Sequence, residues 1–251
     1  MKIIIIIPAH NEEKRIAKTL EEYGKFFSFG KKNLRVEIVV VLNACKDDTL
    51  GIVKYAEKKY KNIRHIEFEQ CGKGFAIMQG FKEALKGKPD LIGFVDADNA
   101  TTPEAYYQLI KNINGYDGIF GSRYLCGAIV NPPPTISRLI SSRIFNFLIR
   151  AFLLMPYRDT QCGAKIFRSE VLKKTVHKLG ITKWAFDIDL LYQIRKEGFK
   201  LKEYPTVWSD KEYSKINLSR AGPQMFLAVI RLRLLNSPFR HIVEIYNNMR
   251  A

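Results

Sequence analysis

Asp96 and Asp98 are the two side chains whose type and spacing point most directly to chemistry. They stand on either side of Ala97, directly after the apolar residues 91–95, which have the composition of a buried strand. In open α/β sheets, ligands bind outside the carboxyl ends of the strands. Two carboxylates at that place suit Mg²⁺ or Mn²⁺ carrying a diphosphate. The alternative is that Asp98 or Asn99 only caps the helix that follows.

A second polar segment, residues 8–13, follows the first predicted strand. Its side chains could hold a nucleotide base or ribose by hydrogen bonds, and His10 is the histidine of most interest because it lies there. The alternative is a helix start with Asn11 as N-cap, and both interpretations can hold together. No Gly-x-Gly-x-x-Gly sequence follows this strand, so a dinucleotide-binding Rossmann site is not favoured.

The elements that must position these residues alternate along the first half of the chain. Nearly continuous apolar, β-branched runs predict strands over 2–7, 36–42, 63–68, 91–95 and 118–121, and amphipathic segments predict helices over 12–27, 47–60, 74–85 and 103–113. This alternation predicts an α/β fold, a mostly parallel sheet with helices on both faces. Farther along we expect helices over 136–155, 186–196 and 222–235, a strand over 164–168 and a polar loop over 207–217.

Composition indicates a globular protein with an anionic partner. The chain has 251 residues and a net charge of +16, and we expect a single domain, residues 1–251, in two halves, 1–122 and 123–251. Two stretches, 118–157 and 213–243, contain no Asp or Glu. Such cationic stretches suit anionic lipid, nucleic acid or phosphorylated substrates. Nucleic acid is disfavoured because no recognition motif is present and the basic residues lie among apolar runs.

The two basic helices, 136–155 and 222–235, are also rich in apolar residues. Each can be a core helix or lie in a membrane interface, where arginines meet phosphates. No run reaches the roughly 18–20 apolar residues of a membrane span, so we expect peripheral contact with a membrane. The four cysteines are scattered, which favours reduced thiols in the cytoplasm over a zinc site.

Seven short motifs form an ordered series. They are Ile7-Pro8-Ala9-His10-Asn11-Glu12-Glu13, Asn43-Ala44-Cys45-Lys46-Asp47-Asp48-Thr49, Lys73-Gly74, Asp96-Ala97-Asp98, Gly121-Ser122-Arg123-Tyr124, Asp159-Thr160-Gln161-Cys162-Gly163-Ala164-Lys165 and Trp184-Ala185-Phe186-Asp187. The series resembles the family 2 glycosyltransferases with the GT-A fold, and more narrowly the polyprenyl-phosphate glycosyltransferases of the dolichyl-phosphate glucosyl and mannosyl group. The resemblance extends to about residue 220.

The resemblance implies roles for individual residues. Asp96 and Asp98 would hold the diphosphate through Mg²⁺ or Mn²⁺, and Arg123 would meet the acceptor phosphate. Further substrate-binding candidates are Pro8, His10, Glu12, Asn43, Lys73, Ala97, Arg138, Arg143, Gln161, Lys215 and Arg220. Gln161-Cys162-Gly163 resembles the glucosyl branch, which uses UDP-glucose. Two residues depart from the pattern: Asn43 stands where many relatives carry Asp, and Ala100 where some mannosyl relatives supply a metal ligand.

The implied reaction is inverting displacement at the anomeric carbon of a nucleotide sugar, at the cytoplasmic face of a membrane. A phosphate acceptor is already anionic and needs positioning and charge balance, for which arginine is suited. Asp187 would then orient sugar hydroxyls or an arginine, whereas with a hydroxyl acceptor it would be the general base. Its structural alternative is a helix N-cap. Other functions left open are transfer from GDP-mannose, a basic nucleic-acid-binding protein, and a membrane-surface scaffold without activity.

Overall fold

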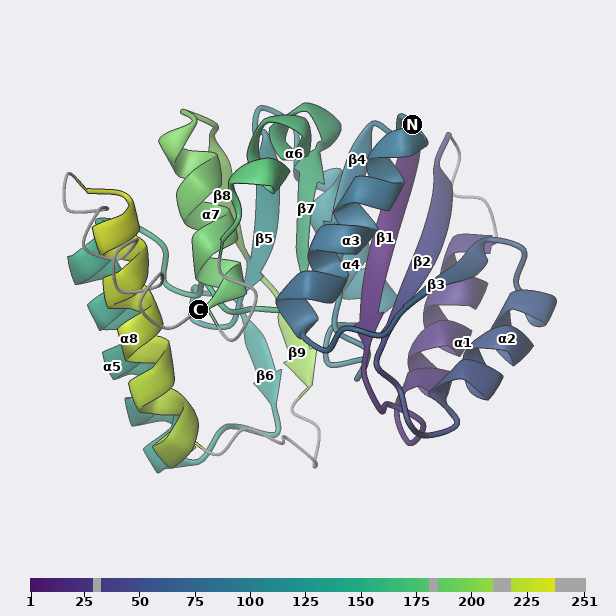
Figure 1. The fold of residues 1–251 in the computed structure, drawn as a ribbon, viewed down its shortest axis with the longest axis horizontal. Helices are drawn as coiled ribbons and strands as arrows, with labels where there is room; N and C mark the ends of the chain where they lie inside the picture. The colour runs from purple at the N-terminus through teal and green to yellow at the C-terminus, as the bar shows by residue number, and fades with distance from the viewer. Residues whose placement is uncertain (29–32, 181–184, 210–217, 238–251) are drawn as a thin grey trace.

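A seven-stranded sheet forms the centre of the molecule in this computed structural model, which describes residues 1–28, 33–180, 185–209 and 218–237 (Figure 1). In spatial order the strands are β3 (Ile63–Phe68), β2 (Arg35–Asn43), β1 (Lys2–Ala9), β4 (Leu91–Phe94), β7 (Lys165–Arg168), β5 (Gly118–Ser122) and β8 (Leu201–Pro205). Neighbouring strands are parallel except around β7, which is antiparallel to both β4 and β5. The prediction of a mostly parallel α/β sheet is confirmed.

The central strands β1 and β4 are almost entirely apolar because helices cover both of their faces. In β1, Ile4 and Ile6 belong to one buried cluster, and Ile3, Ile5 and Ile7 belong to the other. This division follows from the alternation of side chains along a strand. A run of isoleucines therefore serves two cores at once.

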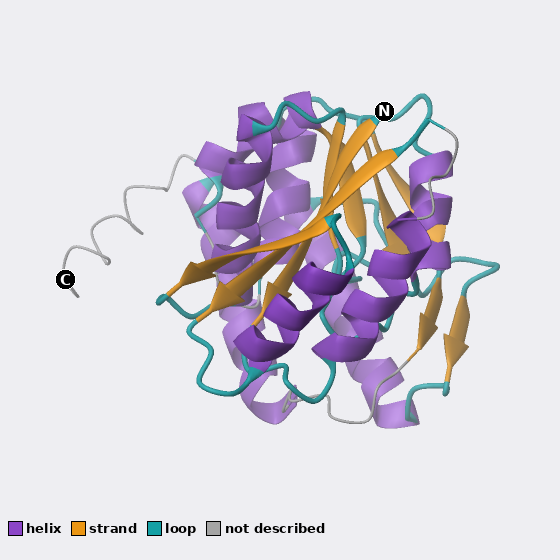
Figure 2. Ribbon diagram, turned by 90° about the vertical axis from the view of Figure 1, so that its right-hand side faces the viewer, coloured by secondary structure: helices purple, strands orange, loops and turns teal. Residues whose placement is uncertain are grey.

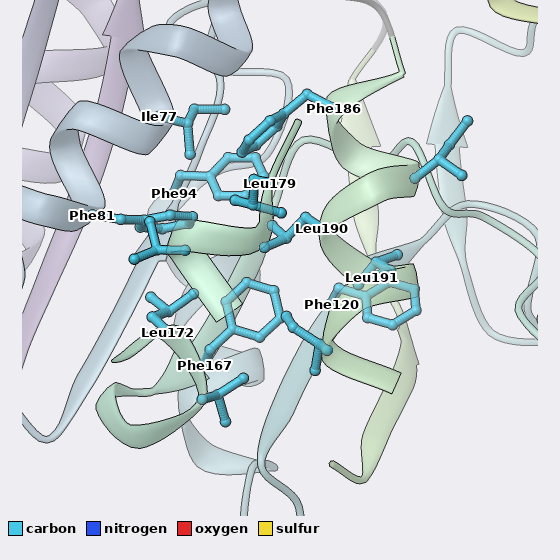
Figure 3. Packing of buried hydrophobic residues seen from close by; sticks show 14 of the residues in the cluster. Ile77, Phe81, Phe94, Phe120, Phe167, Leu172, Leu179, Phe186, Leu190 and Leu191 are labelled. Carbon is cyan, nitrogen blue, oxygen red and sulfur yellow. The ribbon is translucent and has the colours of Figure 1, made fainter. Parts of the chain in front are cut away.

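Each face of the sheet has its own set of helices, as Figure 2 shows edge-on. The side chains of α1 (Ile16–Ser28), α2 (Thr49–Lys59) and α4 (Pro103–Lys111) pack into one core, and those of α3 (Lys73–Lys86), α6 (Ser169–Thr175) and α7 (Phe186–Lys196) pack into the other. Figure 3 shows the second core, where Phe81, Phe94 and Phe167 meet Leu172 and Leu190. A short 3₁₀ segment, Val176–Lys178, follows α6.

Two predicted helix caps are wrong. The N-cap of α4 is Thr102, whose side chain accepts a hydrogen bond from the Ala105 amide, so neither Asp98 nor Asn99 caps that helix. The first helix begins at Ile16, four residues later than predicted, and Asn11 has a left-handed backbone with φ of 53°. The Asn11 side chain instead accepts a hydrogen bond from the Lys46 amide. The carboxylates of Asp96 and Asp98 and the 8–13 loop are therefore available for roles other than helix capping.

The second half of the chain, from residue 123, adds elements beside the sheet. Strands β6 (Ile129–Asn131) and β9 (Val207–Ser209) form a separate parallel pair, so the predicted 207–217 loop is wrong over its first three residues, and residues 210–217 lie outside the described residues. Helices α5 (Ile136–Leu153) and α8 (Leu218–Leu235) lie side by side at one end of the molecule (Figure 1). Among the described residues, no helix is long and apolar enough to span a bilayer.

Candidate active site

The loops that carry the predicted site meet where the strand order of the sheet reverses. Strand β1 pairs with β2 on one side and with β4 on the other, so the chain segments that follow these strands leave the sheet at one edge. Crevices of this kind bind ligands in α/β proteins. Because β7 runs the opposite way, the segment before it, residues 159–164, arrives at the same edge. Strands β3 and β5 run in the same direction as β1, so the motifs that follow them reach this edge as well. Six of the seven motifs, all except the one that contains Asp187, therefore converge here.

Asp96 and Asp98 lie in this crevice with partly exposed carboxylates, 34% and 25% accessible. The Thr19 hydroxyl donates to the carbonyl oxygen of Ala97, which fixes the backbone between them. Asp98 Oδ1 accepts a hydrogen bond from the Ala100 amide at 3.0 Å. Burial raises the pKa of Asp98, and the negative charge of Asp96 adds to this, while Ala100, Arg15 and Lys73 partly oppose the shift.

Both carboxylates have cations beside them. Lys73 Nζ lies 2.6 Å from Asp96 Oδ1, and Arg15 Nη1 lies 3.9 Å from Asp98 Oδ2. Desolvation lowers the pKa of Lys73, but the attraction of Asp96, Asp187 and Asp98 outweighs it and the pKa ends above its usual value. Lys73 therefore carries a positive charge at neutral pH.

Gly163 allows the chain to pass directly over Asp96. A Cβ atom added at Gly163 would lie 1.9 Å from Asp96 Oδ2 and 2.4 Å from its carboxyl carbon, far inside van der Waals contact. Any side chain at this position would push the carboxylate out of place. The glycine of the Gln161-Cys162-Gly163 motif is thus explained by close packing against the Asp96-Ala97-Asp98 motif.

The two carboxylates fit a divalent metal that is shared with a ligand. Within the described ranges, no group of three or more His, Cys, Asp or Glu side chains gathers to form a complete protein site. Mg²⁺ is commonly held by one or two carboxylates, with water and substrate phosphates filling its other positions. Asp96 and Asp98 supply such a donor set, and a diphosphate would supply the remaining oxygens.

The loops after β1 and β2 are joined by hydrogen bonds around Asn43, which is 1% exposed. With its amide oriented to suit its neighbours, Asn43 Nδ2 donates to the Ala9 carbonyl at 2.7 Å, and Oδ1 accepts from the Gly72 amide at 2.9 Å. His10 Nδ1 donates to the Asn43 carbonyl at 2.6 Å. Asn43 thus ties together three segments that line the crevice, and its contact with a nucleotide stays a prediction.

Glu12 is held in place by Arg15, which donates to both carboxylate oxygens at 2.7 and 2.6 Å. The Glu12 amide donates to the Thr49 hydroxyl, so this loop is fixed to the start of α2. The sequence analysis did not identify Arg15. A signal was present, because an arginine three residues after a glutamate is in reach of it on a helical turn.

Asp187 forms a buried ion pair with Lys165. Lys165 Nζ donates to Asp187 Oδ1 at 2.5 Å and to the Cys162 carbonyl at 2.6 Å, and the lysine side chain is fully buried. The N-cap of α7 is Ala185, and Asp187 lies in the first turn, so the predicted alternative of Asp187 as N-cap is wrong. Lys165 was not singled out, since a lone lysine in a strand carries no pattern.

Arg123 forms a second buried ion pair, with Asp159. Arg123 Nε and Nη2 donate to the two oxygens of Asp159 at 2.7 and 2.9 Å, and the Arg123 amide donates as well. Desolvation lowers the pKa of Arg123, but Asp159 more than compensates and the pKa ends above its usual value. The guanidinium also lies 5.2 Å from the Trp208 ring centre and 5.5 Å from that of Tyr124. Most of this guanidinium is therefore engaged within the protein.

Arginines on α5 continue the positive charge away from Arg123. The Arg143 guanidinium lies 5.0 Å from the centre of the Tyr124 ring, so this ring has both Arg123 and Arg143 close to it. A cavity of about 280 Å³ opens beside α5 and is lined by Arg143, Asn146, Phe147, Arg150 and Arg158. Asn146 is 6% exposed, and its Oδ1 has no hydrogen-bond partner within the described part of the chain.

The other predicted residues are placed as follows. Pro8 is buried in β1 opposite Val41, and Gln161 is half-buried in the segment before β7. Arg138 belongs to α5 and Arg220 to α8, but their side chains are not described. Lys215 and Trp184 lie outside the described residues.

Comparison with known proteins identifies the family of this chain. The family model described as glycosyl transferase family 2 matches residues 4–176. The chain is 30% identical over 256 residues to the dolichyl-phosphate beta-glucosyltransferase of Dictyostelium discoideum and 32% identical over 248 residues to that of Drosophila melanogaster, covering 75% of each relative. These alignments include 96% and 92% of this chain.

Two further comparisons concern a longer relative and a solved structure. Glycosyltransferase AglD of Haloferax volcanii is 28% identical over 88% of this chain, which spans only 35% of that protein's length. The crystal structure of glucosyl-3-phosphoglycerate synthase from Mycobacterium tuberculosis in complex with Mn²⁺, uridine diphosphate and phosphoglyceric acid aligns with a TM-score of 0.69 at 18% identity, covering 93% of this chain and 77% of that one. This likeness concerns the fold.

Proposed function

The chain belongs to glycosyl transferase family 2, and from this premise we propose that it transfers glucose from UDP-glucose to a polyprenyl phosphate of the dolichyl-phosphate class. Relatives that cover most of the chain carry the name dolichyl-phosphate beta-glucosyltransferase. UDP-glucose has an α-glycosidic bond, so formation of a β-linkage requires inversion by a single displacement. The observation that carries the proposal is the pair of carboxylates, Asp96 and Asp98, at the reversal of strand order, with Lys73 Nζ 2.6 Å from Asp96 Oδ1.

The donor would bind over the ends of β1, β2 and β4. The segments joined by Asn43 would form the nucleotide pocket, with Pro8, His10 and Glu12 along it. Asp96 and Asp98 would hold Mg²⁺ or Mn²⁺, which would supply Lewis-acid stabilisation of the diphosphate leaving group. Lys73 adds a positive charge where negative charge develops on the leaving group.

The acceptor is better matched by a phosphate than by a hydroxyl group. A hydroxyl must lose its proton in the reaction, so it requires a general base. The best-placed carboxylate, Asp187, accepts a hydrogen bond from the buried Lys165 ammonium group at its Oδ1, so this oxygen is already engaged within the protein. A phosphate monoester needs no such base, and the α5 cavity offers the guanidinium groups of Arg143, Arg150 and Arg158, which suit phosphate oxygens.

Helix α5 would bring the enzyme to a membrane from its cytoplasmic side. Ile140, Ile144 and Phe147 are 53%, 56% and 67% exposed and share one face of the helix through their spacing. Arg143 and Arg150 flank this face. Apolar side chains with adjacent arginines are typical of helices that lie in the interface of a bilayer.

The function is tested by measuring transfer of label from radiolabelled UDP-glucose to a polyprenyl phosphate, with Mn²⁺ and with EDTA. Asp98→Asn is the test variant, and Glu170→Gln, which removes an exposed carboxylate on α6, is the matched control. We expect metal-dependent label in the lipid that is lost only in the Asp98 variant. Transfer of label from GDP-mannose, or onto a sugar hydroxyl, would be consistent with the family assignment but would refute the proposed substrates. DNA binding without UDP binding would overturn the proposal.

A further inference from the structure

A cation of the protein itself is in contact with the carboxylate pair. Lys73 Nζ lies 2.6 Å from Asp96 Oδ1, a distance at which a second cation on the same oxygen would be repelled. Arg15 also faces the pair, but its guanidinium is fixed on Glu12 through two hydrogen bonds and stays 3.9 Å from Asp98. Lys73 is therefore the cation that holds Asp96 directly.

The Lys73 side chain is partly exposed, whereas the backbone beside it is held. Lys73 begins α3, and the amide of the preceding Gly72 is bound by Asn43 at 2.9 Å. The side chain is 43% exposed and consists of a flexible stem with a compact charge. The ammonium group can thus leave Asp96 for another anion nearby without any change in the sheet.

The charges around the pair oppose the binding of either ligand component alone. Asp96, Asp98 and Glu12 are countered by Lys73 and Arg15, which leaves one net negative charge. A diphosphate that binds alone is repelled by this excess negative charge. A divalent cation that binds alone is repelled by the ammonium group of Lys73, which already occupies Asp96. When both arrive together, the diphosphate offers the ammonium group a new partner and Asp96 becomes available.

We propose that Lys73 is a resident cation that occupies Asp96 until the donor binds, then transfers to the donor diphosphate, so that metal and nucleotide bind in a mutually dependent way. This inference rests on the proposed function, because it takes a diphosphate as the ligand of the site. Coupling between two ligands is reciprocal. UDP must therefore raise the affinity for the metal by the same factor by which the metal raises the affinity for UDP.

Binding of Mn²⁺, measured by the loss of the free-ion electron paramagnetic resonance signal with and without UDP, tests the inference without turnover. We expect wild-type protein to bind Mn²⁺ weakly alone and about tenfold or more tightly with UDP, within the usual range of coupling. Lys73→Met should bind Mn²⁺ alone at least about threefold more tightly than wild type, and UDP should enhance its affinity less. Lys73→Arg retains the charge and should keep affinity for Mn²⁺ alone low.

The controls separate this inference from the proposed function. Lys82→Met removes an exposed lysine of the same helix and should behave as wild type. Unchanged or weaker Mn²⁺ affinity of Lys73→Met without UDP, with UDP-dependent Mn²⁺ binding intact in wild type, would overturn the role of Lys73 alone. If wild type binds no Mn²⁺ even with UDP, or if Asp98→Ala binds it equally well, the metal site of the proposed function is wrong and this inference falls with it.

Discussion

Lys165 and Asp187 are in direct contact inside the protein: Lys165 Nζ lies 2.5 Å from Asp187 Oδ1, and the lysine side chain is fully buried. The pair joins β7 to the first turn of α7. Removal of one partner of a buried pair leaves an uncompensated charge, whereas removal of both is far better tolerated. Comparison of single and double variants can therefore distinguish the structural role of Asp187 from its proposed role toward the substrate.

Asp187→Asn should lower the free energy of unfolding by about 3–5 kcal/mol, because Lys165 stays buried without its counter-ion. The double variant Lys165→Met with Asp187→Asn should recover most of that loss. If Asp187 orients the substrate, the recovered protein should still turn over at least about 100-fold more slowly than wild type. Denaturant unfolding and glucosyl transfer measured on the same preparations check both statements; a stable and fully active double variant would refute the substrate role.

Arg123 and Asp159 should also be strongly coupled in stability. Because Arg123 binds both oxygens of Asp159, we expect Asp159→Asn to lower the free energy of unfolding by about 3–5 kcal/mol. A double-mutant cycle with Arg123→Met should give a clear interaction energy. Burial raises the pKa of Asp159, but Arg123 and its amide more than compensate, so the pKa is depressed. The contribution of this carboxylate to the free energy of unfolding is therefore fully present at pH values above the ordinary pKa of aspartate. It is lost as the pH falls through the depressed pKa of Asp159. Denaturant unfolding between pH 7 and 3 measures this, and equal acid sensitivity in Asp159→Asn would contradict it.

Gly163→Ala should impair the metal site while leaving the fold largely intact. The new Cβ would collide with Asp96 Oδ2, 1.9 Å away, and the partly exposed carboxylate would have to turn aside. We expect metal-dependent UDP binding to weaken by about tenfold or more, since a ligand displaced by an ångström loses much of its contact. Gly180→Ala is the matched control, because its added Cβ meets no atom within 4 Å. Calorimetric titration with UDP and Mn²⁺ compares them, and equal affinities would exclude close packing as the reason for the glycine.

Thiol reactivity should separate Cys162 from the exposed cysteines. Burial raises the pKa of Cys162 to about 11, so at pH 8 only about one molecule in a thousand carries the reactive thiolate. Cys71 and Cys126 are exposed and should react first. Alkylation at pH 8 followed by peptide mass spectrometry should label Cys71 and Cys126 and spare Cys162 until the protein is unfolded. Early labelling of Cys162 would show that the segment before β7 opens.

Membrane contact should depend on the exposed face of α5. Replacement of Ile144 and Phe147 by Glu removes apolar area and introduces charge repulsion at an anionic surface, so co-sedimentation with vesicles containing anionic lipid should fall by about tenfold or more. Tyr55→Glu changes an equally exposed residue on α2, 69% accessible, and should have little effect. Equal sedimentation of the two variants would place the membrane contact elsewhere.

The sequence was most informative where local pattern and burial agree. The apolar runs of β1, β2 and β4 indicated buried strands correctly because both of their faces are covered. Strand β8, Leu201–Pro205, was missed because it lies at the edge of the sheet and its residues are only half-buried, which leaves no continuous apolar run. The antiparallel direction of β7 could not be read from Lys165–Arg168, since the composition of so short a strand carries no direction.

The site was predictable as a set of motifs but less so as a set of contacts. Asp96, Asp98 and Lys73 were predicted site residues, and the structure brings them together because Asp96 and Asp98 follow β4 and Lys73 follows β3. Asp187 was also a candidate, and it lies in the first turn of α7. The partners Lys165 and Asp159 were not assigned roles. Each pairs with a residue more than 20 positions away, and such pairing depends on the topology of the sheet.

The position of β7 also limits how this protein can be divided or recombined. Strand β7 stands between β4 and β5, and β5 finds its other neighbour only in β8, residues 201–205. A fragment that stops at residue 122 would contain β4 with a bare edge and β5 with no neighbour, which invites pairing with other chains. Chimeras that exchange donor and acceptor specificity between relatives should therefore be built by grafting individual loops onto an intact sheet, because a junction at the middle of the chain would separate interleaved strands.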